Sequence, residues 1–224
     1  MIDQLIIGDK GSYDDFGASL SKRNIGQPKK KSIKETVPFS NKTYDFSAIN
    51  GEIYWEEREL EYTFEMTANT PEKLEEMKGA FADWVMYIHE QDIHDPFIFG
   101  YHFVGTFAEV DFEDDEGLDK TTATVKFTAY PFKLSNIVKK YTYTINAGAT
   151  IDVSMLNQSV HRVIPTITAD KDFILKTGTA SISVSAGMGM TGKIMFDTGI
   201  VKIALQNPNA SACTVEFSFF EEVL

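Results

Sequence analysis

The sequence predicts a mainly β protein, built from an N-terminal α+β domain with one helix flanking a β-sheet or barrel, and a C-terminal antiparallel β-sandwich. Three observations predict this class. One early segment alternates strictly between apolar and polar residues, and the next has the apolar spacing of a helix. The chain after Lys140 consists of short strand-like runs separated by turn residues.

The alternating segment, residues 61–67, has the pattern of a half-buried strand. Tyr62, Phe64 and Met66 fall on one face of this strand, whereas threonine and glutamate side chains fall on the other. We therefore expect one face of the first domain's sheet to be buried and the other to meet solvent.

A helix is predicted to begin directly after this strand. Thr70 offers an N-cap hydroxyl, Pro71 suits the first helical position, and Glu72 places a carboxylate near the positive end of the helix dipole. The apolar residues that follow have amphipathic spacing: Leu74, Met77, Phe81, Trp84, Val85 and Ile88. The helix should end near residues 89–91, and it is the only one that the sequence predicts convincingly.

Residues 96–112 and 121–132 are rich in aromatic and β-branched residues and predict a long hairpin with an acidic tip. Seven short strands are predicted downstream, at residues 141–145, 163–168, 173–175, 181–185, 193–196, 200–205 and 214–220. Such closely spaced strands favour a sandwich. We place the domain boundary near residues 136–140, which gives domains at 1–138 and 139–224.

The chain is acidic, with a formal net charge of −12 over 224 residues. Residues 1–140 carry 16 of the 21 basic and 26 of the 33 acidic side chains. Because such a surface repels phosphates, general binding of nucleic acid is disfavoured. The first ten residues lack the pattern of a signal peptide, and no apolar run is long enough to span a bilayer, so we expect neither secretion nor membrane anchoring.

Two groups of residues resemble functional sites, one a dinucleotide-binding turn and the other a metal site. Neither has the sequence context that such a site requires. Residues 187–192 have the glycine spacing of a dinucleotide-binding turn, but residues 193–205 predict strands where a helix is required, so a glycine-rich loop is favoured. His89, His94 and His102, with Asp92 and Asp95 nearby, match no recognised spacing of metal ligands. We therefore predict no catalytic residue, metal or cofactor, and a protein that is not an enzyme.

Several short pieces of sequence occur in the order seen in the N-terminal domain of siphophage distal tail proteins. They are Asp15-Phe16-Gly17, residues 22–28, Val37-Pro38, residues 44–47, residues 54–60 and residues 129–133. The chain thus resembles this family of baseplate and tail-tip hub proteins, and its β-only remainder is similar to the family's galectin-like C-terminal domain. It departs at Pro38-Phe39-Ser40, where many relatives have Pro-Gly-Arg.

This resemblance implies a structural virion protein of a phage or prophage, made in the bacterial host cytoplasm and located at the tail tip. It implies a homo-oligomer, a hexameric ring between the tail tube protein and the fibre or lysin hub protein. In the family the N-terminal domain builds the ring, and an extended belt reaches the neighbouring subunit. DNA would pass through the lumen, and the acidic charge of the first domain would keep it from sticking.

The sequence contains a candidate for such a belt. Residues 25–50 are poorly periodic and dotted with apolar side chains: Ile25, Ile33, Val37, Phe39, Tyr44, Phe46 and Ile49. A monomer would gain little by exposing them, so we hypothesise that this segment packs on a neighbouring protomer and closes a ring.

Three alternatives remain open. A tail-tube or tail-completion protein would share the sheet and helix of the first domain, although the extra sandwich favours the distal position. A carbohydrate-binding module is suggested by the sandwich, although both tryptophans, Trp55 and Trp84, lie in the first domain. An enzyme is the least favoured, because no set of residues with catalytic roles can be assembled.

Overall fold

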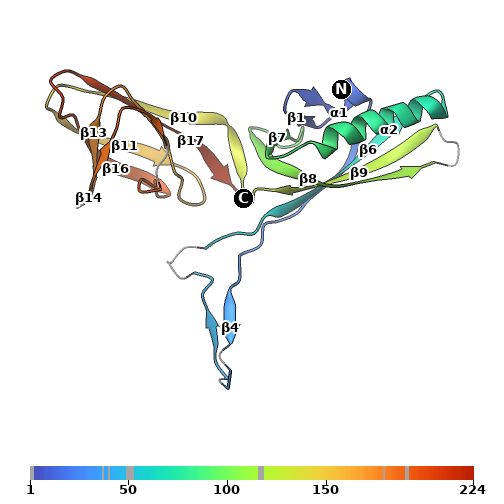
Figure 1. Ribbon diagram of the computed structural model, residues 1–224, viewed down its shortest axis with the longest axis horizontal. Coiled ribbons are helices and arrows are strands. Elements are labelled where there is room, and N and C mark those ends of the chain that lie inside the picture. The colour runs from blue at the N-terminus through green and yellow to red at the C-terminus, as the bar shows by residue number, and fades with distance from the viewer. Residues whose placement is uncertain are drawn as a thin grey trace. The chain divides into compact units, whose positions relative to one another are not determined.

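The computed structural model describes residues 3–36, 38–39, 41–48, 53–115, 119–178, 180–189 and 192–224. The protein is mainly β, as the sequence predicts (Figure 1). It divides into two compact units, unit 1 at residues 1–133 and unit 2 at residues 134–223. The boundary expected after residue 138 lies inside strand β10 (Lys133–Ile145).

Unit 1 contains a sheet in which every described pairing is antiparallel. Its order is β3-β6-β9-β8-β7-β1-β2. The strands are β1 (Ile6–Ile7), β2 (Lys10–Gly11), β3 (Ser19–Ile25), β6 (Arg58–Thr67), β7 (Gln91–His94), β8 (Tyr101–Asp114) and β9 (Lys120–Ala129). The predicted alternation of β6 is confirmed, because Tyr62, Phe64 and Met66 are buried while Glu65 is exposed.

Helix α2 (Pro71–Met86) covers the buried face of this sheet (Figure 1). Its start is confirmed: the Thr70 hydroxyl accepts a hydrogen bond from the Lys73 amide at 3.3 Å. The helix ends at Met86, before the predicted end. The chain leaves the helical path there because the carbonyl oxygen of Ile88 accepts a hydrogen bond from the amide of Phe107, on β8, at 2.9 Å.

A second, five-residue helix, α1 (Ser12–Phe16), was not predicted. It is too short to show helical periodicity, and Gly17 ends it in the left-handed conformation, with φ of 68°. Its last residue, Phe16, stacks on Trp84 of α2 with ring centroids 4.6 Å apart. The predicted amphipathic helix therefore packs against α1 as well as against the sheet.

Strands β8 and β9 confirm the predicted hairpin, with different bounds. Residues 96–100 form a turn instead of a strand, because the Asp95 carboxylate accepts a hydrogen bond from the Phe97 amide at 2.9 Å and the Asp95 carbonyl accepts one from Ile98 at 3.0 Å. Strand β7, which precedes this turn, was not predicted. Glu113 and Asp114, expected at the tip, belong to β8.

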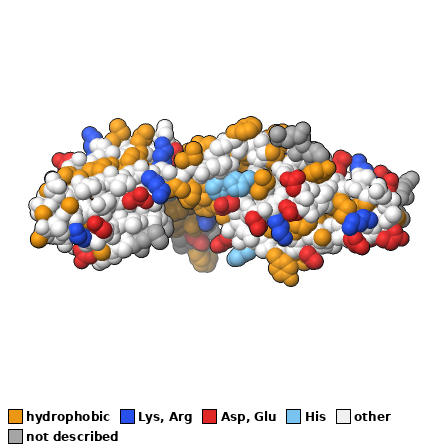
Figure 2. Space-filling view, turned by 90° about the horizontal axis from the view of Figure 1, so that it is seen from above, with side chains coloured by type: hydrophobic (Ala, Val, Ile, Leu, Met, Phe, Trp, Pro, Cys, Tyr) orange, Lys and Arg blue, Asp and Glu red, His pale blue; other side chains and the backbone are white. Residues whose placement is uncertain are grey.

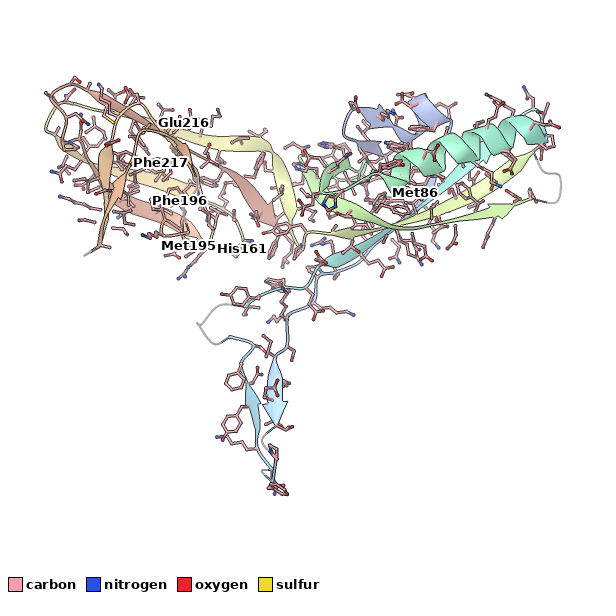
Figure 3. The ribbon with its side chains drawn as sticks, in the orientation of Figure 1. Met86, His161, Met195, Phe196, Glu216 and Phe217 are labelled. Atoms are coloured by element: carbon pink, nitrogen blue, oxygen red, sulfur yellow. The ribbon has the colours of Figure 1, made fainter. Side chains whose placement is uncertain are left out.

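Unit 2 contains two four-stranded arrays, in the orders β15-β12-β17-β10 and β11-β16-β13-β14. Besides β10 the strands are β11 (Thr150–Asn157), β12 (Thr166–Ala169), β13 (Phe173–Thr177), β14 (Ala180–Val184), β15 (Gly187–Gly189), β16 (Gly199–Gln206) and β17 (Cys213–Val223). The buried rings of Phe196 and Phe217 have centroids 5.6 Å apart in the core of this unit (Figure 3).

Three predictions for unit 2 were wrong in detail. Residues 193–196 do not form a strand; Phe196 makes one isolated bridge, to Val163. Strand β11 was missed. Residues 187–189 of the glycine-rich segment, which was expected to be a loop, form β15, in which Gly187 and Gly189 are paired with residues of β12. A three-residue strand of sequence Gly-Met-Gly has no side-chain pattern from which it could be recognised.

Candidate assembly interface

The segment between β3 and β6, residues 26–57, is called the arm. Expected to be irregular, it is a two-stranded ribbon in its described part and continues the pairing of β3 with β6 (Figure 1). The Gly26 amide donates to the Glu59 carbonyl, and the Lys31 amide donates to the Tyr54 carbonyl, each at 2.8 Å. Farther out, β4 (Lys34–Thr36) pairs with β5 (Thr43–Asp45).

The register of this ribbon places apolar side chains together. Glu35 lies opposite Tyr44, and the amide of Phe46 donates to the carbonyl of Ile33 at 2.8 Å. Because opposite residues share a face and successive residues alternate, one face carries Ile33, Glu35, Tyr44 and Phe46, and the other carries Lys34, Thr36, Thr43 and Asp45. The first set is called the arm face.

The arm face is exposed. Ile33 is 54% exposed, Tyr44 41% and Phe46 40%, and the rings of Tyr44 and Phe46 stack with centroids 6.4 Å apart. An isolated two-stranded ribbon is marginally stable in water, and the described part of the chain leaves the apolar side of this one exposed. Packing against another surface would both bury these side chains and hold the ribbon.

The other residues predicted for this interface have different positions. Phe39, in the turn between β4 and β5, is fully exposed, with φ of 67°. Ile25 instead packs against the core of unit 1, so it does not contribute to the arm face. Val37 and Ile49 lie outside the described residues.

The root of the arm is held by side chains of unit 1. Pro28 is buried, and Trp55 meets Phe132 edge to face with centroids 6.1 Å apart. Lys30 forms a bridge with Trp55, and its ammonium lies 5.9 Å from the centre of the indole ring. Lys29, Lys30 and Lys31 are all exposed, so this basic run meets solvent at the root of the arm.

The sheet of unit 1 has a second notable surface, on the side that α2 does not cover. Its carboxylates are called the acidic face: Glu59, Glu61 and Glu65 of β6, with Glu109, Asp111 and Glu113 of β8. Lys126 pairs with Glu109 at 2.8 Å, and Lys120 pairs with Glu65 at 3.2 Å. The carboxylates outnumber the lysines of β9, so this surface is negative.

The residues first considered as metal ligands have other partners. Asp95, whose side chain is fully buried, accepts from Arg23 Nη1 at 3.0 Å to both oxygens and from the Tyr62 hydroxyl at 3.3 Å. Burial, together with Asp95, raises the pKa of Tyr62. Within the described ranges, no group of three His, Cys, Asp or Glu side chains could hold a metal ion.

The histidines of β7 and β8 lie together. The rings of His94 and His102 have centroids 5.1 Å apart, and Figure 2 shows a group of histidine side chains on the viewed face. Asp92 lies 3.5 Å from His102. Burial, and then the neighbouring His102, lowers the pKa of His94, so this pair favours the neutral form of that ring.

Two tyrosines of unit 2, Tyr141 and Tyr143, make hydrogen bonds inside the unit. The Tyr141 hydroxyl donates to the Leu156 carbonyl and accepts from the Leu156 amide, each at 3.0 Å. The Tyr143 hydroxyl donates to the Ser154 carbonyl at 3.2 Å. Both rings therefore join β10 to β11. None of the helices in the part of the chain that is described is long and apolar enough to cross a membrane.

No model of a known protein family matches the chain, and no curated protein does. Among solved structures, the chain is similar over 100% of both lengths to the crystal structure of the SPP1 Dit protein, with 13% identity and a TM-score of 0.70. That protein is described as a paradigm of the hub adsorption apparatus in phages that infect Gram-positive bacteria. This chain shares its fold.

Weaker similarity extends to two structures of the phage p2 baseplate in its activated conformation. The structure with strontium gives 9% identity over 98% of both chains and a TM-score of 0.39. The structure with calcium gives 10% identity over 97% of this chain and 98% of that chain, with a TM-score of 0.38.

Proposed function

We propose that this chain is a structural subunit of a siphophage tail tip, which assembles into a closed ring, a hexamer, between the tail tube and the fibre or lysin hub. The observation that supports this most is its likeness to SPP1 Dit, which extends over the whole chain and includes both units at a TM-score of 0.70. The protein works by binding its neighbours and not by catalysis.

The arm face supplies the contact between protomers. A ribbon that presents Ile33, Tyr44 and Phe46 on one side needs a surface on which to bury them. If the arm of each copy packs on the next copy, the contact is heterologous, and a heterologous contact whose rotation closes produces a ring. The ordered root at Trp55 and Phe132 limits the directions that the arm can take.

The acidic face lines the lumen of this ring. Strands β6 and β8 present alternating carboxylates to solvent, and a field of one sign in a confined channel repels the phosphates of DNA. The genome can then pass during ejection without binding to the wall.

Native mass spectrometry and negative-stain imaging of the purified chain test this function. We expect one discrete oligomer, seen as rings with an open centre, and no growth into long tubes. Long tubes would instead identify the chain as a tail-tube protein. A chain that stays monomeric at every concentration would contradict a ring.

A further inference from the structure

A groove of about 610 Å³ lies in unit 1 between the β1-β2 hairpin, α1 and the C-terminal end of α2 (Figure 1). Three aromatic rings line it, those of Phe16, Trp84 and Tyr87. Tyr87 is 84% exposed, and Met86, which precedes it at the end of α2, is 58% exposed (Figure 3). This part of unit 1 therefore presents apolar side chains to solvent, outside the core of the sheet.

The same groove carries charges of both signs. Asp9, Lys10 and Asp83 line it beside the rings, and among the described residues no ion pair is found for any of the three. The Lys10 ammonium instead lies 5.6 Å from the centre of the Phe16 ring. A groove that combines rings with uncompensated charges suits a partner surface that is itself partly apolar and partly charged.

The arm face has such a composition. Beside the exposed rings of Tyr44 and Phe46 it carries one carboxylate, Glu35, which lies opposite Tyr44 and has no ion-pair partner among the described residues. When the arm face is buried between protomers, Glu35 is buried with it. Because a buried carboxylate is costly unless a cation meets it, the surface that receives the arm must offer a cation among apolar groups.

Lys10 meets this requirement, since its ammonium lies next to an aromatic ring and is not engaged by a described carboxylate. Three other lysines of unit 1 already pair with carboxylates of their own sheet or helix: Lys78, Lys120 and Lys126.

The overall charges of the two surfaces are also complementary. Residues 29–46, which include the arm face, carry five lysines and two carboxylates, so the arm is basic in a chain whose net charge is −12. The groove carries two carboxylates and one ammonium. Opposite fields steer two surfaces together before their side chains meet.

We propose that this groove receives the arm face of a second copy of the chain, with Glu35 of the arm paired to Lys10. The rings of the arm then pack against those of Trp84 and Tyr87. Within one copy both surfaces stay exposed, so the contact forms between copies. Each copy offers one arm and one groove, and this heterologous contact can repeat around a ring. The inference rests on the proposed function and names the receiving surface.

Exchanging the two charges tests the pair, with assembly followed by native mass spectrometry over a range of protomer concentrations. Glu35→Lys and Lys10→Glu should each raise the concentration needed for half assembly about tenfold, because each sets like charges against one another. Both changes in one chain should restore assembly to within about threefold of the wild type. The matched control joins Glu35→Lys to Lys22→Glu, on β3, and should not restore assembly.

Removing a ring tests the apolar part of the groove. Tyr87→Ser should weaken assembly about tenfold, since the ring is buried only in the contact between copies. Phe99→Ser is the matched control, because Phe99 is 87% exposed in the turn between β7 and β8, and it should leave assembly unchanged. Neither ring belongs to the core, and circular dichroism shows that each variant is folded.

Chemical cross-linking shows whether the contact joins different copies. A chain that carries both Lys10→Cys and Glu35→Cys, treated with a short bis-maleimide reagent, should give a ladder of covalent oligomers on a denaturing gel. Either variant alone should give no ladder, and Cys213 is buried and does not interfere. Monomers cross-linked within themselves would mean that the arm packs on its own groove, and would overturn the proposal.

The outcomes separate this inference from the proposed function. Rings that form equally well in the wild type, in Glu35→Lys and in Lys10→Glu would show that the groove does not receive the arm, while the ring itself stands. A double exchange that fails to restore assembly would likewise overturn the pair. A wild-type chain that never assembles would contradict the proposed function, and this inference with it.

Discussion

The amide nitrogen of Phe46 lies 2.8 Å from the carbonyl oxygen of Ile33, and this hydrogen bond brings two side chains thirteen positions apart onto one face of the arm. The bond belongs to the two-stranded ribbon in which β4 pairs with β5. Because two-stranded ribbons are marginally stable alone, the ribbon should open readily unless a partner covers it.

Hydrogen exchange should therefore depend on assembly at the arm. We expect the amides of Lys31 and Phe46 to exchange slowly in the oligomer and rapidly in diluted monomer, as measured by mass spectrometry of peptides from the arm. Amides of β6 around Tyr62, which lie in the core sheet, serve as the control and should stay protected in both states. Equal protection of the arm amides in both states would mean that the ribbon is stable without a partner subunit.

In the buried ion pair of unit 1, replacing Arg23 should lower the free energy of unfolding more than replacing Asp95 does. Arg23→Met leaves the fully buried Asp95 carboxylate without its cation and should lower the free energy of unfolding by roughly 3 kcal/mol. Asp95→Asn leaves a guanidinium that is partly exposed and can be hydrated, so it should cost roughly 1–2 kcal/mol. Urea titration measures both values, and a larger loss for Asp95→Asn would contradict this account.

Cys213 should react slowly in the folded protein. It is fully buried, and its thiol donates to the Lys171 carbonyl at 3.6 Å. Burial raises the pKa of the thiol, so less of the reactive thiolate exists at a given pH, and the reaction should need a more alkaline pH than an ordinary thiol does. Labelling with a chromogenic disulfide should be at least about tenfold slower in buffer than in denaturant. Equal rates would show that β17 opens freely.

Reversing a charge on the acidic face should make the ring bind DNA. Asp111→Lys introduces a cation among the carboxylates of β6 and β8, so we expect the assembled ring to retain DNA in a binding assay and phage carrying it to eject the genome more slowly. Asp152→Lys makes the same change on β11 of unit 2 and is the control. If the two variants behave alike, the acidic face does not line the channel.

The sequence predicted best the elements whose signal is local. Strand β6 was recognisable from its alternation and α2 from the Thr70-Pro71 start, because both depend on residues close together in the chain. Helix α1 is too short to show a period. The end of α2 could not be predicted, since it depends on a hydrogen bond between Ile88 and Phe107, which belong to different elements.

For the candidate interface, the sequence identified the apolar residues but not which of them share one face. The apolar residues of the arm were evident, but only the register of β4 with β5 shows that Ile33 and Phe46 share a face while Ile25 faces the core. The acidic face had a local signal in Glu59, Glu61 and Glu65, which alternate with buried residues. Their neighbours on β8 could be assigned only from strand pairing.

The most direct test of the central claim is the native mass of a chain whose arm face has been made polar. Ile33→Ser combined with Phe46→Ser should convert the ring into folded monomers, because the face that is buried between protomers loses its apolar side chains. Thr36→Ala combined with Thr43→Ala alters the opposite face of the same ribbon and should leave the ring intact. Rings of unchanged mass from the first variant would contradict the claim that the arm holds the assembly together.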